Sequence, residues 1–114
     1  MASSPALNAG DLVLLPFPYT DLSASKQRPA LILVPPDRVG DLVAIAITSQ
    51  PGHSNTVSLT TSDLARGVMP KDSWVRADKI VTLHSGLIRK TLGTVKPALL
   101  TAVRDILCPT LGCK

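Results

Sequence analysis

Aromatic residues are scarce in this chain of 114 residues, which contains one phenylalanine, one tyrosine and one tryptophan, at Phe17, Tyr19 and Trp74. Proteins that bind unpaired bases by stacking need a platform of aromatic side chains. Stacking therefore cannot be the main binding mode here. The core must instead be built from Leu, Val, Ile and Ala.

Cysteine is also rare, with Cys108 and Cys113 both in the C-terminal "CPTLGC". No histidine or second cysteine pair stands nearby to complete a zinc site. A disulfide would be unusual in a reducing cytosol, so we interpret the two as ordinary thiols in a C-terminal tail. No metal or other cofactor is expected.

Long hydrophobic runs are absent as well. No apolar stretch approaches the roughly 20 residues that span a membrane. The N-terminal "MASSPALNAG" lacks the basic start and apolar core of a signal peptide. The sequence therefore predicts a cytoplasmic protein that does not contact a membrane.

Acidic residues are outnumbered, with 8 Asp and Glu against 12 Lys and Arg, which gives a net charge of +4 and an isoelectric point near 9.4. This balance favours polyanionic partners such as nucleic acid. The cations are spread along the chain, so no polybasic tail is indicated. At this length, residues 1–114 are expected to form one domain.

Short apolar segments separated by proline and glycine predict a mainly β protein. The expected strands cover residues 11–18, 28–35, 42–49, 56–60 and 73–83, the last as one long strand or two short ones. We expect the segment at 56–60 to pair back on its predecessor, giving a meander of antiparallel hairpins.

Two helical segments are expected. Residues 96–107 carry apolar positions at the spacing of one helical face, with Pro97 tolerated in the first turn. The segment "SDLARG" indicates a single turn with Ser62 or Asp63 as its cap and Gly67 at its end. Short strands followed by one helix favour a small closed or half-closed barrel with a helix packed on it, between tails at 1–9 and 108–114.

Arg28 is the first candidate functional residue. It precedes Pro29, so its backbone is expected to be extended and to begin a strand at the rim of the core. A guanidinium fixed there suits a phosphate or carboxylate, although a solvated cation at a strand entry is the simpler interpretation. Thr48 and Ser49 likewise end a buried strand with hydroxyls, which commonly satisfy turn backbone groups.

"WVRADKI" is the second candidate segment. On a strand, Arg76 and Asp78 point to one face, whereas Val75, Ala77 and Lys79 point to the other. A carboxylate beside a guanidinium suits proton transfer together with phosphate neutralisation, and a plain salt bridge is the alternative. Two histidines, His53 and His84, lie in expected turns or strand ends, where most histidines have no catalytic role.

Together, "GDLVLLPFPYTDLSASKQRPALIL", "AIAITSQ" and "SWVRADKI" resemble the MazF/PemK family of toxins from type II toxin-antitoxin systems. The resemblance implies an SH3-like barrel of antiparallel strands with a C-terminal helix, the CcdB/MazF-type fold, assembled as a homodimer. It also implies a toxin endoribonuclease that cleaves single-stranded RNA, including mRNA, at short sequences without ribosome or metal. Attack by the ribose 2'-hydroxyl would leave a 2',3'-cyclic phosphate and a 5'-hydroxyl.

The resemblance also implies roles for four residues. Arg28 matches the strand-entry arginine that neutralises the transition state, and Thr48 matches the threonine that bonds the scissile phosphate. Arg76 and Asp78 match the pair of the PemK-like branch, with Asp78 as candidate base. Arginine stays protonated at neutral pH, so we assign charge stabilisation to Arg76. The first long loop, "YTDLSASKQ", lacks the histidine that this branch carries there.

Further RNA contacts are expected from position alone at Lys26, Ser49, Gln50 and Lys71. A cognate acidic antitoxin is expected to lie in the same groove and compete with RNA phosphates for the cations. Two alternatives remain open: a non-catalytic toxin that grips a protein, like the gyrase poison CcdB, and an inactive RNA-binding relative. The chain ends "TLGCK" rather than in the Trp-Gly-Ile of such gyrase poisons.

Overall fold

One antiparallel sheet of seven strands dominates the computed structural model, which describes residues 7–16, 27–52, 54–69 and 71–112. The strands are β1 (Asp11–Pro16), β2 (Gln27–Val34), β3 (Asp41–Thr48), β4 (Thr56–Leu59), β5 (Leu64–Gly67), β6 (Ser73–His84) and β7 (Lys90–Val95). Their order across the sheet is β4-β6-β3-β2-β1-β7-β5. One α-helix, α1 (Pro97–Leu111), and two short 3-10 turns, η1 (Thr61–Asp63) and η2 (Ser85–Leu87), complete the fold.

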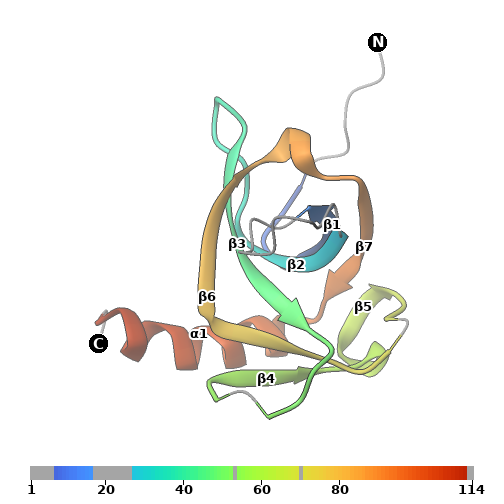
Figure 1. The fold of residues 1–114 in the computed structure, drawn as a ribbon, viewed down its shortest axis with the longest axis vertical. Coiled ribbons are helices and arrows are strands. Elements are labelled where there is room, and N and C mark those ends of the chain that lie inside the picture. Colours follow the sequence, from blue (N-terminus) through green and yellow to red (C-terminus); the bar gives the residue numbers. More distant parts are fainter. Residues whose placement is uncertain (1–6, 17–26, 53, 70, 113–114) are drawn as a thin grey trace.

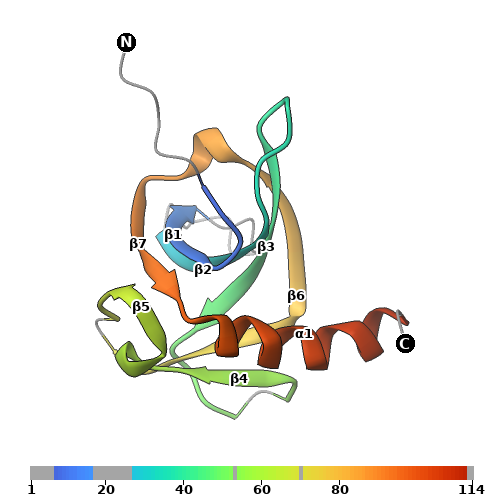
Figure 2. The ribbon, with the colours of Figure 1, turned by 180° about the vertical axis from the view of Figure 1, so that it is seen from behind.

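The sheet curls on itself, so that β6 and β7 stand on opposite sides of β1, β2 and β3 (Figure 1). Viewed from behind, α1 crosses the lower part of the molecule, next to β4 and β6 (Figure 2). This half-barrel of antiparallel strands with one C-terminal helix confirms the predicted fold class. No helix in the described ranges is long and apolar enough to cross a membrane.

Leu, Ile, Val and Ala fill two core clusters, as the lack of aromatic residues predicts. The lower cluster joins the sheet to α1 through Leu99, Val103 and Leu107. The upper cluster is formed mainly by β1, β2 and β3, with Leu15 and Ile32 fully buried. Buried apolar side chains on both faces explain why β2 and β3 have almost continuous hydrophobic sequences.

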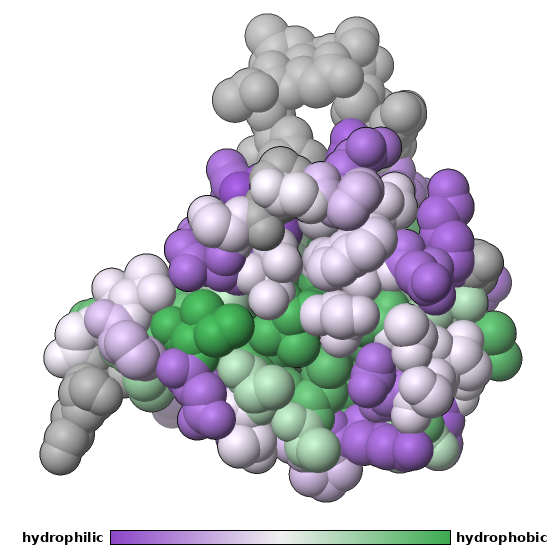
Figure 3. All heavy atoms as spheres, turned by 90° about the horizontal axis from the view of Figure 1, so that it is seen from below, coloured by the Kyte–Doolittle hydropathy of each residue, from purple (hydrophilic) through white to green (hydrophobic). Residues whose placement is uncertain are grey.

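The underside of the molecule, where β4 and α1 lie, carries a band of apolar surface between polar side chains (Figure 3). Partly buried apolar residues packed against the lower cluster include Val57 on β4 and Leu100 and Ile106 on α1. An apolar surface of this kind is poorly suited to a polyanion.

The expected meander is wrong at β4. This strand pairs with β6, through Thr56↔Arg76 to Leu59↔Ser73, and β6 lies between β4 and β3. Proximity in sequence favoured a hairpin with β3, but the edge of β3 is taken by the 12-residue β6. The first part of β6 therefore carries β3 on one side and β4 on the other.

The "SDLARG" turn also differs from expectation. The helical part is η1 alone, and its N-cap is Thr60, whose backbone N–H donates to Asp63 Oδ2 at 2.8 Å. The following residues form β5, which pairs with β7, so Gly67 belongs to a strand. The pairing partner β7 was not predicted, because "KTLGTV" is short, contains glycine and shows no clear alternation.

Helix α1 continues four residues beyond the predicted end at 107, so Cys108 lies in its last turns rather than in a tail. Pro109 removes one backbone donor, but the Thr110 hydroxyl donates to the Ile106 carbonyl at 3.0 Å. Gly112, at φ 81°, ends the helix in the left-handed conformation that favours glycine. Cys113 lies outside the described residues.

Replacing Gly67 by alanine is expected to destabilise the fold more than the same change at Gly52. Both glycines have similar positive φ values, 92° and 97°. Each substitution should therefore cost roughly 1–2 kcal/mol in backbone conformation. At Gly67 the new Cβ would also lie 2.3 Å from the Leu92 carbonyl oxygen, whereas nothing lies within 4 Å at Gly52.

Chemical denaturation of both variants would measure the difference in the free energy of unfolding. We expect an excess of about 1–3 kcal/mol for Gly67→Ala, the usual range for overpacking. Equal losses in the two variants would contradict the close β5–β7 contact.

Candidate active site

Arg28 and Thr48 lie at the neighbouring ends of β2 and β3. The two strands pair through Ala30↔Ala46 and Leu31↔Ile45. Carrying this antiparallel register two residues further sets Arg28 opposite Thr48. Side chains directly opposite each other project from the same face of a sheet. The structure therefore places these half-buried residues next to each other at one strand end.

The Thr48 hydroxyl takes part in the turn that follows β3, accepting a hydrogen bond from the Gln50 backbone N–H at 3.0 Å. This is the local bond expected of a strand-end threonine. Because the bond uses only an oxygen lone pair, the hydroxyl hydrogen can still be donated to another acceptor. The turn thus orients Thr48 without using its donor.

Arg76 and Asp78 lie where β6 departs from regular pairing with β3. Between Ile45 and Ile47 on β3, the partner on β6 changes from Ile80 to Val75. Residues 76–79 therefore form an enlarged bulge opposite a single residue of β3. Bulges often redirect side chains beside active sites.

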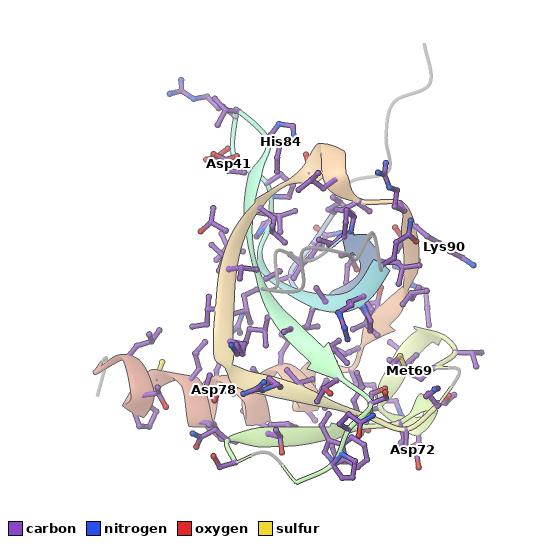
Figure 4. The ribbon with its side chains drawn as sticks, viewed as in Figure 1. Asp41, Met69, Asp72, Asp78, His84 and Lys90 are labelled. Atoms are coloured by element: carbon purple, nitrogen blue, oxygen red, sulfur yellow. The ribbon has the colours of Figure 1, made fainter. Side chains whose placement is uncertain are left out.

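The predicted alternation holds at the start of this bulge. Val75 and Ala77 are fully buried, whereas Arg76 and Asp78 face outward with side-chain exposures of 20% and 31%. Lys79, expected on the inner face, is exposed, because the chain leaves the ladder here. In Figure 4, Asp78 lies on the side of the molecule away from Lys90.

The two outward residues form one ion pair, with Arg76 Nη2 at 3.5 Å from Asp78 Oδ2. At this exposure the pair adds less than about 1 kcal/mol to stability. The Nε atom of Arg76 is buried and makes no hydrogen bond within the described ranges. Buried donors without acceptors are rare in proteins, so Arg76 is a candidate functional residue.

The four catalytic candidates lie on three neighbouring strands. β2, β3 and β6 are consecutive neighbours in the sheet, and Thr48 pairs with Trp74, which shares its face of β6 with Arg76. Two guanidinium groups, one hydroxyl and one carboxylate are thus distributed over three adjacent strands. Such a set can bind a phosphate, stabilise developing negative charge and accept a proton.

A pocket of about 620 Å³ opens beside Arg28; we call it the barrel-mouth pocket. Its floor is apolar, and its polar lining includes the predicted Ser49 and Lys71. The lining residues that the structure describes are Leu14, Gln27, Arg28, Pro29, Ile47, Ser49, Met69, Lys71, Ser73, Lys90 and Leu92. Thr48, Arg76 and Asp78 are outside this lining, so Arg28 alone belongs to both the pocket and the catalytic candidates.

Sequence reasoning missed Lys90 and Gln27, which also line this pocket. Gln27 begins β2 one residue before Arg28, and Lys90 begins the strand β7, which was not predicted. Gln27 directly precedes Arg28 in the sequence, so a search around Arg28 could have found it. Lys90 had no comparable signal in the sequence.

The remaining residues singled out in the sequence do not line the barrel-mouth pocket or lie outside the described residues. Gln50 is exposed after β3 and does not line the barrel-mouth pocket. Lys26 and His53 lie outside the described residues. His84 uses both ring nitrogens in turn structure: Nδ1 accepts from the Gly86 N–H at 2.9 Å, and Nε2 lies 3.0 Å from the Val39 carbonyl oxygen. His84 is the last residue of β6, six residues beyond Asp78, and the two lie well apart in Figure 4.

Within the described ranges, no group of three His, Cys, Asp or Glu side chains lies close enough together to hold an ion. The charged groups near Arg28 are cations, which suit an anion.

Comparison with known proteins adds independent information. Residues 8–111 match the family of PemK-like, MazF-like toxins of type II toxin-antitoxin systems. A comparison with curated protein sequences gave no match.

Solved structures with the same fold include MazF from Deinococcus radiodurans, at 28% identity and a TM-score of 0.76, with 96% of this chain and 99% of that chain covered. An endoribonuclease from a mycobacterial species, in complex with its cognate antitoxin, is 25% identical with a TM-score of 0.71, covering 97% and 98% of the two chains. The MazE–MazF complex of D. radiodurans gives 28% identity and a TM-score of 0.71, with coverages of 96% and 98%.

Proposed function

Because the chain belongs to the family of PemK-like, MazF-like toxins of type II toxin-antitoxin systems, we propose that it is an endoribonuclease. Its substrate is single-stranded RNA, cut at short sequences without the ribosome. Two similar solved proteins are described as endoribonucleases, at 25% and 26% identity. The net charge of +4 is consistent with a polyanionic substrate.

The observation that supports the proposal is that Arg28, Thr48 and the Arg76–Asp78 ion pair lie on three adjacent strands. RNA cleavage by its own 2'-hydroxyl needs a base for that hydroxyl and positive charge for the phosphorane-like transition state. Both requirements are met by side chains of this group. The reaction proposed here therefore uses no metal ion.

In the proposed reaction, Asp78 accepts the proton of the 2'-hydroxyl as its oxygen bonds to phosphorus. The bond between phosphorus and the 5'-oxygen of the next nucleotide breaks, and water protonates that leaving oxygen. The products are a 2',3'-cyclic phosphate and a 5'-hydroxyl. Arg28 and Arg76 stabilise the added negative charge, and Thr48 donates a hydrogen bond to a phosphate oxygen.

A protein antitoxin is the proposed inhibitor. Three of the similar structures are toxin–antitoxin complexes. An acidic segment lying along the same residues would place carboxylates where RNA phosphates bind, so that toxin inhibition is competition for Arg28 and its neighbouring cations. The proposed assembly is a homodimer in the cytoplasm.

Incubating the purified protein with long single-stranded RNAs of varied sequence in EDTA tests the proposed activity. Discrete cuts at a shared short sequence are the expected result. Intact RNA over all sequences would refute the endoribonuclease proposal and favour a protein-binding toxin or an inactive RNA-binding relative.

Removing the Thr48 hydroxyl is expected to lower cleavage moderately. Thr48→Val keeps the branched shape and deletes one hydrogen bond to a charged phosphate, worth about 1.5–3 kcal/mol or a 10- to 150-fold loss in kcat/KM. Steady-state cleavage of a short RNA would measure it. Thr48→Ser should restore much of the activity, and a Thr48→Val variant as active as the native protein would remove Thr48 from the reaction.

A further inference from the structure

Lys90 lines two pockets on the same side of the molecule. One is the barrel-mouth pocket, and the other, of about 510 Å³, lies near η2; we call it the η2 pocket. Figure 4 shows the course of this surface, with Met69 at its lower end, Lys90 beside β7 and His84 near its upper end. Pockets of this size hold small-molecule groups such as a nucleobase, whose usual sites are about 300–1,000 Å³.

The described charged residues that line the two pockets all carry the same sign. Arg28 and Lys71 line the lower pocket, Arg89 lines the upper one, and Lys90 lines both. Among the residues that the structure describes, no Asp or Glu lines either pocket. In contrast, a third pocket on β7, lined by Arg66 and Asp11, carries both signs. Such a cation-only surface is complementary to a run of phosphates.

Lys90 is held at a defined distance from Arg28 by strand β1. Leu14 of β1 pairs with Lys90 on β7, and the next residue, Leu15, pairs with Arg28 on β2. Two strand spacings separate the backbones of Lys90 and Arg28, roughly 10 Å. The Arg89 N–H also donates to the Leu14 carbonyl at 2.8 Å, which fixes the start of β7.

We propose that these two pockets form a path for the single-stranded RNA next to the cleaved bond, with Lys90 as a phosphate-binding residue. The inference rests on the proposed endoribonuclease function and adds a substrate-binding surface to it. Apolar residues of the lower pocket, such as Ile47 and Met69, contact the face of an unpaired base, while Ser49 and Gln27 present groups that hydrogen-bond its edge. The scissile phosphate lies at Arg28, and the neighbouring phosphates continue towards Lys90 and Arg89.

Salt-dependent binding of an uncleavable RNA tests the path. The probe is an RNA carrying a 2'-O-methyl group at the cleaved nucleotide, and the variants are Lys90→Ala and, as a matched control, Lys96→Ala. Lys96 is exposed at the start of α1, makes no side-chain cap bond and lines neither pocket. Lys90→Ala should weaken binding about 3- to 10-fold and reduce the slope of log K against log salt by about 0.7, the value for one phosphate of a single strand. Lys96→Ala should change neither.

A second experiment measures cleavage of RNAs of different length. The increase in KM caused by Lys90→Ala should disappear when the RNA is shortened so that it no longer reaches β7. An unchanged salt slope, or an effect independent of RNA length, would overturn the path while leaving the endoribonuclease function in place. An effect on antitoxin binding alone would also overturn it. If the native protein neither cuts nor binds RNA, the proposed function itself fails.

Discussion

Arg28→Ala is expected to lower kcat/KM for RNA cleavage by about two to three orders of magnitude, the usual loss when one main stabiliser of transition-state charge is removed. Arg28 is the residue that adjoins both Thr48 and the barrel-mouth pocket. Its loss would therefore affect the reacting phosphate and the entry to the binding path. Steady-state kinetics with a short fluorogenic RNA would measure the change.

Two companion variants separate charge from geometry. Arg28→Lys keeps the charge but loses the planar fork of donors, so an intermediate rate is expected. Arg38→Ala removes an exposed arginine in the turn between β2 and β3 and should cleave like the native protein. If Arg28→Ala remains folded and cleaves at the native rate, Arg28 has no part in the reaction.

Asp78→Asn is expected to lower kcat by about two to four orders of magnitude, the contribution of a positioned general base. Asparagine has nearly the same shape and cannot take up the proton of the 2'-hydroxyl. The exposed ion pair with Arg76, at 3.5 Å, contributes little to stability, so the variant should stay folded. Single-turnover cleavage at saturating enzyme would isolate the chemical step.

A purely structural role for Asp78 predicts a different result for the same variant. If Asp78 serves only as the salt-bridge partner of Arg76, Asp78→Asn would shift the unfolding free energy by less than about 1 kcal/mol and leave kcat unchanged. Asp105→Asn is the matched control, because Asp105 is exposed on α1. Equal kcat values in the two variants would assign the base to another group.

Strands with strong local signals were predictable to within a residue or two. β2 and β3 are apolar runs bounded by prolines and glycines, and their observed limits, Gln27–Val34 and Asp41–Thr48, differ little from those expected. The outward direction of Arg76 and Asp78 followed from alternation alone. These features depend on residues close together in the sequence.

Features set by distant pairing were not predictable in the same way. β7 exists because β1 and β5 pair with it on its two sides, and β4 joins β6 because β6 covers the edge of β3. The helix was expected to end at residue 107, but α1 continues to Leu111. Pro109 lies in its final turn, where the Thr110 hydroxyl and the Gly112 cap complete the bonding.

The same distinction between local signals and distant pairing applies to the candidate site. Arg28 and Thr48 could be selected from strand entry and strand end, and their adjacency required the β2–β3 register. The bulge that sets residues 76–79 apart from β3 has no sequence signature. Lys90 lies beside the barrel-mouth pocket because β7 pairs with β1 at Leu14. Its proposed part in the binding path therefore depends on strand pairing and could not be predicted from the sequence.

The chemistry of the fragment ends tests the central claim most directly. One RNA that is cut at a single position would be digested in EDTA, and the mass of both fragments would be determined. A 2',3'-cyclic phosphate on one fragment and a 5'-hydroxyl on the other is the predicted result, with no cleavage when that ribose lacks its 2'-hydroxyl. A 5'-phosphate, or equal cleavage of the deoxy substrate, would contradict attack by the 2'-hydroxyl at the group formed by Arg28, Thr48, Arg76 and Asp78.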